Sequence, residues 1–431
     1  MVVRTPQSTK ASSRRMLTGN SAAAWGARLA DIDYVPAFPI TPQTEIIEKL
    51  SNWFADETLF GRFVTLDSEH SMITAAGAGA ATGCRVFSAT SSQGLLYGME
   101  SLYTVAGWRV PFVLVNVSRA LSAPITLEPD HNDILAARDT GCVQLHAETC
   151  QEVLDLILQA YRIAEDSRVL LPVIVNLDGF YLSFTREPVD IPSQEQARRF
   201  LPAFTPQHAE FRASAPRAQG VAVLGGQLYS HFKQQTHLAT RNAMTVYQEV
   251  AEEFSEIFGR DYDVLDAFQM EDADYALVMI GSFASKAKAA VLALRAEGKR
   301  VGLVRLRMVR PFPAVAVGNA LAGRRVAVID QNVSPGLGGI LYHEIAASVY
   351  HRADRPEVLR SFIGGLGGKD ITLGEFRYLV DALERSRPED VLIEPQFLST
   401  EADKKVVRRM VQTALELDDN PEGGEDDESE T

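Results

Sequence analysis

The stretch that decides the fold reads VPFVLVNV (residues 110–117), then QEVLDLILQAYRIAED (151–166), then LLPVIVNL (170–177). The first and third segments are nearly continuous aliphatic runs, which are typical of strands buried on both faces of a parallel sheet. The middle segment repeats its apolar residues at helical spacing and carries its charges on the other side. Strand, helix and strand in this order predict a βαβ unit, and therefore an α/β fold.

Similar patterns continue on both sides of this unit. Residues 19–29 and 70–83 are rich in alanine and glycine, which predicts helices that approach their neighbours closely. Such packing is expected around a tight cofactor cleft, and equally in a core that holds none. Further along, a predicted helix at 286–297 ends at Gly298, a residue well suited to follow a helix. Three strands are predicted around it, at ALVMIG (276–281), RVGLVRL (300–306) and RVAVID (325–330).

Between these two regions the periodicity weakens, and five prolines interrupt residues 187–262. This pattern predicts a long connection that contains one helix, at about 245–258. Five parts are therefore expected along the chain. They are a flexible N-terminal arm (1–16), an α/β domain (17–190), a linker with a helix (191–262), a second α/β domain (263–385), and a C-terminal helix with an acidic, disordered tail (386–431).

Composition and charge exclude several classes of protein. The net charge is −14, but residues 416–430 hold nine acidic residues and no Lys or Arg, so the body is only mildly acidic. No basic patch suggests nucleic-acid binding, and no apolar run is long enough to insert into a membrane. Residues 1–15 lack the apolar segment of a secretory signal, and their composition fits either a transit peptide or a flexible arm on a partner subunit. A cytoplasmic location is expected. The three cysteines form no CxxC pair, and no histidine spacing indicates a metal site.

Polar residues follow several strand-like runs, where parallel sheets bind ligands. Thr41 lies between two prolines in FPITP (38–42), and Glu69 begins a small-residue helix. Ser92 and Gln93 lie in ATSSQG (89–94), and Arg119 ends the most hydrophobic strand. Each residue also has an ordinary structural explanation. Thr41 would then be part of a stiff turn, Glu69 would favour the helix dipole, the hydroxyls would cap a helix, and Arg119 would form an ion pair.

Taken together, these segments resemble one family. LTGNSAAAWGA, FPITPQTEIIEKL, LDSEHSMITAAGAGAATG, TSSQGLLYGMESL, VNVSRALSAP, DHNDILAARDTG and LPVIVNLDGF occur in one order, as in the α subunit of pyruvate:ferredoxin oxidoreductase and its 2-oxoacid oxidoreductase relatives. The likeness covers residues 17–188 and continues more thinly through VRLRMVRPFP, VIDQNVSPGLGG and FIGGLGGKDIT. It implies a parallel-sheet domain of the pyrimidine type, which binds thiamine diphosphate, and a second α/β domain like the C-terminal domain of transketolase.

The resemblance also implies roles for particular residues. Glu69 would be catalytic, since the acid of this segment contacts N1′ of the aminopyrimidine ring and shares a proton with it. Thr41 and Arg119 would hold the carboxylate of the substrate. The implied cofactor-binding residues are Pro39, Ile40, Glu69, Ser92 and Gln93.

Other requirements of the reaction are missing from this chain. It has no GDG segment for Mg²⁺ and the diphosphate, and too few cysteines for [4Fe–4S] clusters. The resemblance therefore implies partner subunits of the β, γ and δ types that supply both, and a chain that is inactive alone. The implied reaction is oxidative decarboxylation of a 2-oxoacid to its acyl-CoA, with coenzyme A as co-substrate. Ferredoxin, or NAD through a flavin subunit, would accept the electrons.

One segment departs from the family pattern. After SAP, relatives that act on pyruvate commonly have an aromatic-containing segment, whereas this chain has ITLEP (125–129). Glu128 and Pro129 leave other substrates open, such as an aryl 2-oxoacid like phenylglyoxylate, or oxalate. Two rival hypotheses remain: a thiamine enzyme of the transketolase type without iron, and a non-catalytic scaffold subunit.

Overall fold

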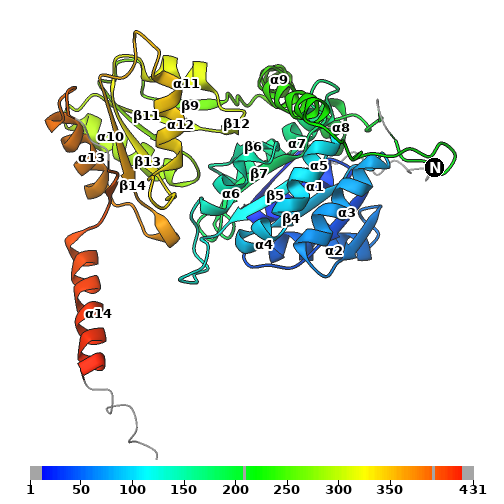
Figure 1. Cartoon of the computed structure of the whole chain (residues 1–431), viewed down its shortest axis with the longest axis horizontal. Helices are drawn as coiled ribbons and strands as arrows, with labels where there is room; N and C mark the ends of the chain where they lie inside the picture. The colour runs from blue at the N-terminus through cyan, green and yellow to red at the C-terminus, as the bar shows by residue number, and fades with distance from the viewer. Residues whose placement is uncertain (1–11, 207–209, 391–393, 420–431) are drawn as a thin grey trace, which may run out of the picture.

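The computed structural model describes residues 12–206, 210–390 and 394–419 of the 431-residue chain. They form two α/β units that lie next to each other, with helix α14 extending away from the second unit (Figure 1). The predicted fold class, α/β with parallel-sheet domains, is confirmed. The first eleven residues of the predicted arm and the acidic tail from residue 420 onward lie outside the described residues.

The first unit runs from β1 to α9. Its strands are β1 (Ser13–Thr18), β2 (Tyr34–Ala37), β3 (Arg62–Thr65), β4 (Phe87–Thr90), β5 (Val113–Ser118), β6 (Val143–His146), β7 (Val173–Asp178) and β8 (Arg186–Ile191). Its helices are α1 (Gly19–Leu29), α2 (Thr44–Ala55), α3 (Glu69–Ala81), α4 (Ser92–Tyr97), α5 (Met99–Trp108), α6 (Asn132–Ala136), η1 (Ala137–Asp139), α7 (Cys150–Glu165), α8 (Gln194–Phe200) and α9 (Gly226–Phe258).

The central sheet of this unit has the strand order β12-β6-β7-β5-β4, and β4 to β7 run parallel. A parallel bridge between Tyr34 and Val86 links it to the parallel pair β2 and β3. The predicted strands at 110–117 and 170–177 are neighbours, β5 and β7, and every residue of both is buried. α7 lies between two parallel strands along the chain, so the strand–helix–strand alternation is present, but the strand before α7 is β6, which the sequence analysis did not predict.

Close helix packing explains the small residues. A Cβ atom on Gly26 of α1 would lie 3.0 Å from Cβ of Ile157 in α7. A Cβ atom on Gly77 of α3 would lie 2.3 Å from Cγ1 of Val105 in α5. Each large aliphatic side chain buried in this way stabilises the fold by roughly 1.5–3 kcal/mol. The predicted close approach of these helices is therefore confirmed.

The region after residue 186 is more ordered than predicted. β8 pairs antiparallel with β1 in a two-stranded sheet, so Pro188 lies in a strand with only one partner, where a missing amide donor is tolerated. The helix predicted at 245–258 is the last part of α9, which has 33 residues. The first half of α9 escaped prediction because its buried residues begin only at Ala239, so no core-facing stripe marks its start.

The second unit contains a six-stranded sheet of order β15-β14-β13-β10-β11-β9, in which only the β9–β11 pair is antiparallel. Helix α10 ends next to Gly298, whose φ of +88° confirms its predicted place after a helix. The elements are β9 (Leu265–Phe268), β10 (Tyr275–Met279), α10 (Phe283–Ala296), β11 (Val301–Leu306), β12 (Met308–Arg310), α11 (Ala314–Leu321), β13 (Arg325–Asp330), α12 (Ile340–Val349), β14 (Val358–Ile363), η2 (Leu366–Gly368), α13 (Leu373–Arg385), β15 (Gln396–Phe397) and α14 (Glu401–Asp419).

The two units are joined by a strand and by buried charges. β12 follows β11 directly along the chain, yet it pairs antiparallel with β6 at the edge of the first sheet. Beside it, Arg305 lies 3.0 Å from a carboxylate oxygen of Glu148 and 3.0 Å from one of Glu152, and Arg307 also binds Glu152. All four side chains are nearly inaccessible to solvent. The units therefore share both a sheet edge and an internal charge cluster.

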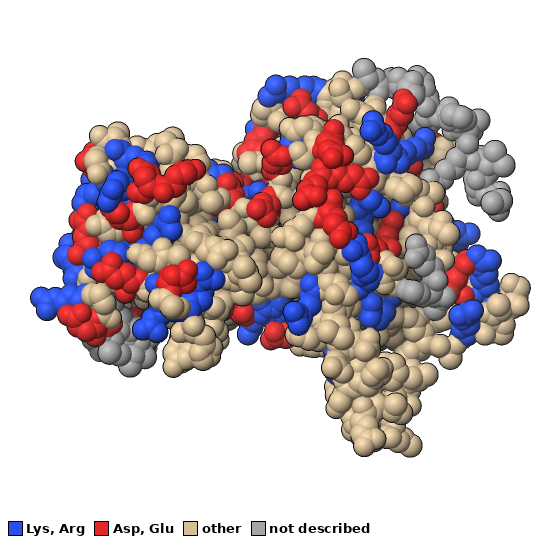
Figure 2. Space-filling model, turned by 90° about the horizontal axis from the view of Figure 1, so that it is seen from above, with Lys and Arg blue, Asp and Glu red and all other residues tan. Residues whose placement is uncertain are grey.

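The described residues include no membrane-spanning helix, and the face drawn in Figure 2 carries both signs of charge. No helix in these ranges is long and apolar enough to cross a membrane. Seen from above, acidic and basic side chains are interspersed over both units (Figure 2). On α14 five large apolar side chains are exposed: Val406, Val407, Met410, Val411 and Leu415.

Candidate active site

The predicted site residues gather at one edge of the first unit. Thr41 follows β2, Glu69 follows β3, Ser92 and Gln93 follow β4, and Arg119 follows β5. These strands run parallel, so their carboxyl ends lie at the same edge, which is where α/β sheets bind ligands. The structure thus brings together residues that are up to 78 positions apart in the sequence.

Glu69 occupies the first position of α3, immediately after Ser68, whose side chain caps the helix by accepting a hydrogen bond from the Ser71 amide. Its side chain is buried, with 4% of the residue exposed. Burial raises the pKa of the Glu69 carboxyl above its ordinary value, and a hydrogen bond from its own backbone amide opposes that shift. The carboxyl is therefore more readily protonated than one in water, as proton exchange with a ring nitrogen requires.

Gly94 of α4 packs directly against this carboxyl. A Cβ atom at position 94 would lie 2.3 Å from Oε1 of Glu69 and 2.8 Å from Oγ1 of Thr90. Only a glycine leaves the carboxyl its present space. Close by in the chain, the hydroxyls of Thr90 and Ser91 are buried and have no hydrogen-bond partner among the described residues.

Arg119 connects the other predicted residues. Its Nη1 donates to the carbonyl oxygen of Thr41 (2.7 Å), and its Nη2 donates to Oε1 of Gln93 (2.9 Å). Burial lowers the pKa of this guanidinium, and the Asp133 carboxylate opposes the shift. Its Nε is buried and finds no acceptor within the described part of the chain. Buried donors are nearly always paired, so this one is available for a bound anion.

The neighbours of Arg119 are fixed by short polar contacts. Nε2 of Gln93 donates to the Ser122 hydroxyl (2.8 Å), and Oγ of Ser92 contacts the Ala120 carbonyl (3.0 Å). Ser92 has a φ of +51°, a conformation that non-glycine residues rarely adopt and that recurs at functional sites. The α4 start and the segment after β5 therefore form one connected wall.

The remaining predicted residues lie in the loop between β2 and α2. Thr41 is exposed and precedes a cis peptide bond to Pro42. Buried Gln43 holds this loop with two hydrogen bonds. Its backbone amide donates to the Ile40 carbonyl (3.0 Å), and its side-chain Nε2 donates to the Phe38 carbonyl (2.8 Å). Pro39 is exposed and Ile40 is half-buried.

Asp133 is a site residue that the sequence analysis missed. It is fully buried, and its Oδ2 accepts hydrogen bonds from the backbone amides of Ser92 (3.0 Å) and Arg119 (3.2 Å). Its other oxygen accepts from the Ser118 hydroxyl (2.9 Å). Burial raises the pKa of Asp133, while hydrogen bonds from the Asn116 side chain, the Ser118 hydroxyl and the Ile134 backbone amide oppose the shift. The available signal was its place in the DHNDILAARDTG segment, where nothing pointed to one acid above the others.

Comparison with known proteins places this chain in a family. Residues 25–253 match the family model described as pyruvate flavodoxin/ferredoxin oxidoreductase, thiamine diphosphate-binding. Residues 273–376 match pyruvate:ferredoxin oxidoreductase core domain II. Pyruvate synthase subunit PorA of Methanocaldococcus jannaschii is 41% identical over 382 residues, which cover 88% of this chain and 97% of that protein. Ketoisovalerate oxidoreductase subunit VorA of Pyrococcus horikoshii is 38% identical over 376 residues, 86% of this chain and 94% of that protein.

A solved structure supports the fold. A 2-oxoglutarate:ferredoxin oxidoreductase from Magnetococcus marinus matches with a TM-score of 0.67 and 19% identity, over 88% of this chain and 67% of that chain. The class is an oxidoreductase subunit whose first domain is of the thiamine diphosphate-binding type. The chain belongs to the pyruvate flavodoxin/ferredoxin oxidoreductase family, which confirms the resemblance seen in the sequence.

The residues present fit the aminopyrimidine end of thiamine diphosphate. A buried carboxyl with a raised pKa suits a ring nitrogen, and the missing side chain of Gly94 makes room for that carboxyl. The unpaired hydroxyls of Thr90 and Ser91 are further polar groups that a bound ligand would satisfy. The diphosphate end finds no equivalent among the described residues, where no cluster of three or more His, Cys, Asp or Glu side chains is arranged to hold a metal ion.

Proposed function

We propose that this chain provides the aminopyrimidine and substrate-carboxylate half of a thiamine diphosphate site, in an enzyme that oxidatively decarboxylates a 2-oxoacid to its acyl-CoA. The observation that carries the proposal is the buried Glu69 carboxyl lying against Gly94, one residue away from the Gln93 side chain that binds Arg119. In the same proposal, residues 17–190 form the cofactor-binding domain, and residues 263–385 form a second domain that supports it.

Each residue has a physical task in this scheme. Glu69 holds a proton at its carboxyl and shares it with N1′ of the aminopyrimidine. Arg119 and Thr41 orient the substrate carboxylate, with Gln93 fixing the guanidinium. Pro39, Ile40, Ser92 and Gln93 shape the walls around the cofactor. When bound, thiamine diphosphate supplies the electron sink that a 2-oxoacid needs to lose CO₂.

Partner subunits must complete the enzyme in this proposal. Burial raises the pKa of Cys142 to about 12 and raises that of Cys150 as well, so both thiols are poor candidates for cluster ligands. We therefore assign Mg²⁺, the diphosphate site and the [4Fe–4S] clusters to subunits of the β, γ and δ types. Coenzyme A is the co-substrate, ferredoxin or an NAD-reducing flavin subunit is the acceptor, and the assembly is cytoplasmic.

Pyruvate is the substrate that we propose first. The pyruvate synthase subunit is slightly more similar than the ketoisovalerate enzyme subunit. The departure at Glu128 carries little weight against pyruvate, because this side chain packs on Gly368 of the second unit: a Cβ atom on Gly368 would lie 3.0 Å from Oε2 of Glu128. The Glu128 side chain is thus directed toward the second unit.

The direct test uses the assembly purified with its co-expressed partner chains. Thiamine diphosphate and iron are measured, and pyruvate, 3-methyl-2-oxobutanoate, 2-oxoglutarate, phenylglyoxylate and oxalate are compared by kcat/KM. We expect both cofactors and the highest value with pyruvate. An assembly with thiamine diphosphate but without iron would favour the transketolase-like alternative, and one without thiamine diphosphate would favour the scaffold.

Arg119→Ala is expected to raise the KM for the 2-oxoacid by about 10- to 100-fold, because a charged hydrogen bond is worth about 1.5–3 kcal/mol. The charge on the carboxylate disperses as CO₂ leaves, so kcat should change less. Arg119→Lys keeps the charge but lacks the planar guanidinium, so its KM should lie between those of the wild type and Arg119→Ala. Arg198→Ala, which removes an exposed partner of Asp31, is the control. An unchanged KM in Arg119→Ala would remove Arg119 from the substrate site.

Gly94→Ala is expected to weaken cofactor binding, because its new Cβ atom would occupy space that the Glu69 carboxyl now fills. Gly107→Ala is a matched control, since Gly107 is also helical and a Cβ atom there would meet no atom within 4 Å. The apparent Kd for thiamine diphosphate of the depleted assembly is the measurement. We expect it to rise at least about tenfold in Gly94→Ala, which corresponds to about 1.4 kcal/mol, and to stay unchanged in Gly107→Ala.

A further inference from the structure

The sheet of the second unit changes direction next to β10. From β10 the chain passes through α10 to β11 on one side, and it later returns to β13 on the other side. In open α/β sheets, ligands bind in the crevice at the carboxyl ends of the strands at such a reversal. Here the residues that follow β10 and β13 contact the first unit instead. The second unit thus holds a protein segment where related sheets hold a small molecule.

A series of hydrogen-bonded side chains crosses the junction between the two units. Nε2 of His131 lies 2.7 Å from Oδ1 of Asp178, and neither side chain is exposed. The other oxygen of Asp178 accepts hydrogen bonds from the backbone amide (2.7 Å) and the hydroxyl (2.6 Å) of Ser282, at the start of α10. Gly281 has a φ of +80°, and a Cβ atom there would lie 2.8 Å from Nε2 of His131. The contact therefore requires both the glycine and the ion pair.

Three further hydrogen bonds hold residues 129–132 on the second unit. The amide of His131 donates to the carbonyl of Gln331 (2.8 Å), just beyond β13. The amide of Val333 donates to the side chain of Asn132 (3.0 Å), and the amide of Gly368 donates to the carbonyl of Pro129 (2.7 Å). This segment is thus held from two loops of the second unit, the one that follows β13 and the one that contains η2.

The next residue in the chain is Asp133, the carboxylate that binds the backbone amides of Ser92 and Arg119. We propose that His131, Asp178 and Ser282 are positioning residues, which transmit the docking of the second unit to the active site. They hold segment 129–133 in place, and Asp133 in turn fixes Ser92 and the main chain of Arg119. The inference rests on the proposed function, because it concerns the residue that we assign to the substrate carboxylate.

The first test replaces His131 in the assembled complex. His131→Leu removes the partner of Asp178 at similar size, whereas His131→Gln keeps an N–H near the position of Nε2. Small displacements of a positioning group cost up to about 100-fold in rate or affinity, so we expect His131→Leu to raise the KM for the 2-oxoacid at least about tenfold. His131→Gln should have a KM close to that of the wild type. Thiamine diphosphate content should be unchanged in both.

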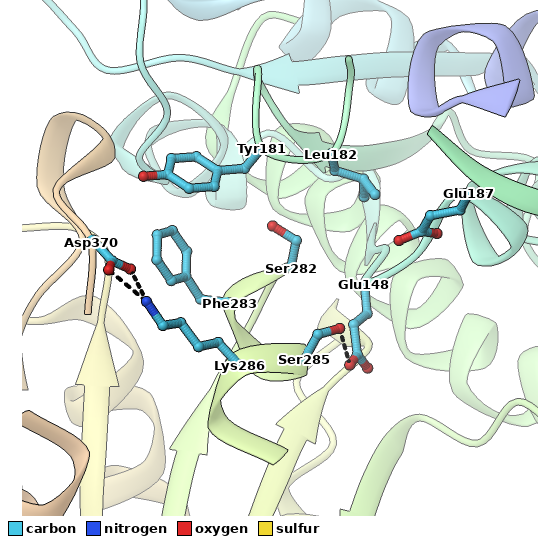
Figure 3. A pocket seen from close by; sticks show the side chains of 9 residues that line it. All are labelled: Glu148, Tyr181, Leu182, Glu187, Ser282, Phe283, Ser285, Lys286 and Asp370. Atoms are coloured by element: carbon cyan, nitrogen blue, oxygen red, sulfur yellow. Dashed lines mark hydrogen bonds and ion pairs between the residues drawn. The ribbon is translucent and has the colours of Figure 1, made fainter. Parts of the chain in front are cut away.

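Two serines at the start of α10 give a matched second test that does not depend on a large core change. They lie near each other beside a cavity of about 240 Å³ between the units (Figure 3). Ser282 binds Asp178, whereas Ser285 binds Glu148 at 2.8 Å. We expect Ser282→Ala to raise KM by several-fold, since charged hydrogen bonds are worth about 1.5–3 kcal/mol and its backbone bond remains. Ser285→Ala should keep the KM of the wild type.

A merely structural role would lower the active fraction, and therefore the apparent kcat, at unchanged KM. The positioning role is overturned if Arg119→Ala raises KM while His131→Leu and Ser282→Ala do not. Should His131→Leu fail to assemble, equal KM values in Ser282→Ala and Ser285→Ala would overturn it. An unchanged KM in Arg119→Ala points instead to a failure of the proposed carboxylate site, so the two ideas fail separately.

Discussion

Glu69→Gln is expected to lower kcat of the assembled enzyme by about 10²–10⁴-fold, the usual contribution of a positioned acid–base group. The amide has nearly the same shape as the carboxyl and fills the same space against Gly94, but it cannot exchange a proton with N1′. The substrate carboxylate is held elsewhere, by Arg119, so the KM for the 2-oxoacid should change little. Steady-state kinetics with saturating thiamine diphosphate measure both constants.

Glu100→Gln provides the control for this change. Glu100 also lies in the first turn of a helix, α5, but its side chain is 87% exposed. We expect the control to keep the turnover of the wild type. If Glu69→Gln retained more than half of the wild-type kcat with cofactor bound, the proton-sharing role of Glu69 would be wrong, and the scaffold hypothesis would gain support.

Glu152→Ala is expected to destabilise the protein by about 3–5 kcal/mol, the usual cost of removing one partner from a buried ion pair. Without this carboxylate, Arg305 loses one of its two acidic partners and Arg307 loses its bond to Glu152, with both guanidiniums still buried. A fall of several degrees in the midpoint of thermal unfolding, at one fixed heating rate, is the expected readout. A midpoint equal to that of the wild type would contradict the assignment of this cluster as stabilising.

Glu249→Ala separates burial from charge in this experiment. Glu249 also pairs with an arginine, Arg168, but both side chains are substantially exposed, and exposed pairs contribute little. Its midpoint should match the wild type.

The same cluster predicts a pH dependence. Burial alone would raise the pKa of Glu152, but Arg305 and Arg307 outweigh it and hold that pKa at about 2. An unfolded Glu has a pKa of about 4.3. The stabilisation from this group is therefore fully present above that value, and it is lost as the pH falls toward 2. Glu152→Ala should show a shallower loss of stability over this interval.

Much of the first unit was predictable because its strands are buried on both faces. The aliphatic runs of β5 and β7 are typical of strands buried on both faces. They predict the α/β fold class and the sheet edge at which the site residues lie. Glu69 and Arg119 were identified because each follows a strand. Their chemical roles, however, came only from the ordered family segments.

Other features depend on contacts that no local pattern records. Asp133 meets Ser92 across 41 positions, and its amide partners are backbone atoms that every residue has. β12 has only three residues, too few for any periodicity, and its partner lies in the other unit. The first turns of α9 have large exposed side chains such as Leu228 and Tyr229, so their helical state leaves no inward-facing stripe.

The placement of β12 has a practical consequence for hybrid enzymes built from two family members. In such a hybrid the recipient supplies the first unit and the donor supplies the rest. A crossover in the linker near residue 262 would place the donor's β12 beside the recipient's β6, opposite Leu145 and Gln144. A crossover after Arg310 would keep that edge and both arginines, 305 and 307, with the carboxylates they evolved beside. The later junction would instead pair a recipient β10 with a donor β13, so each crossover needs one matched strand pair.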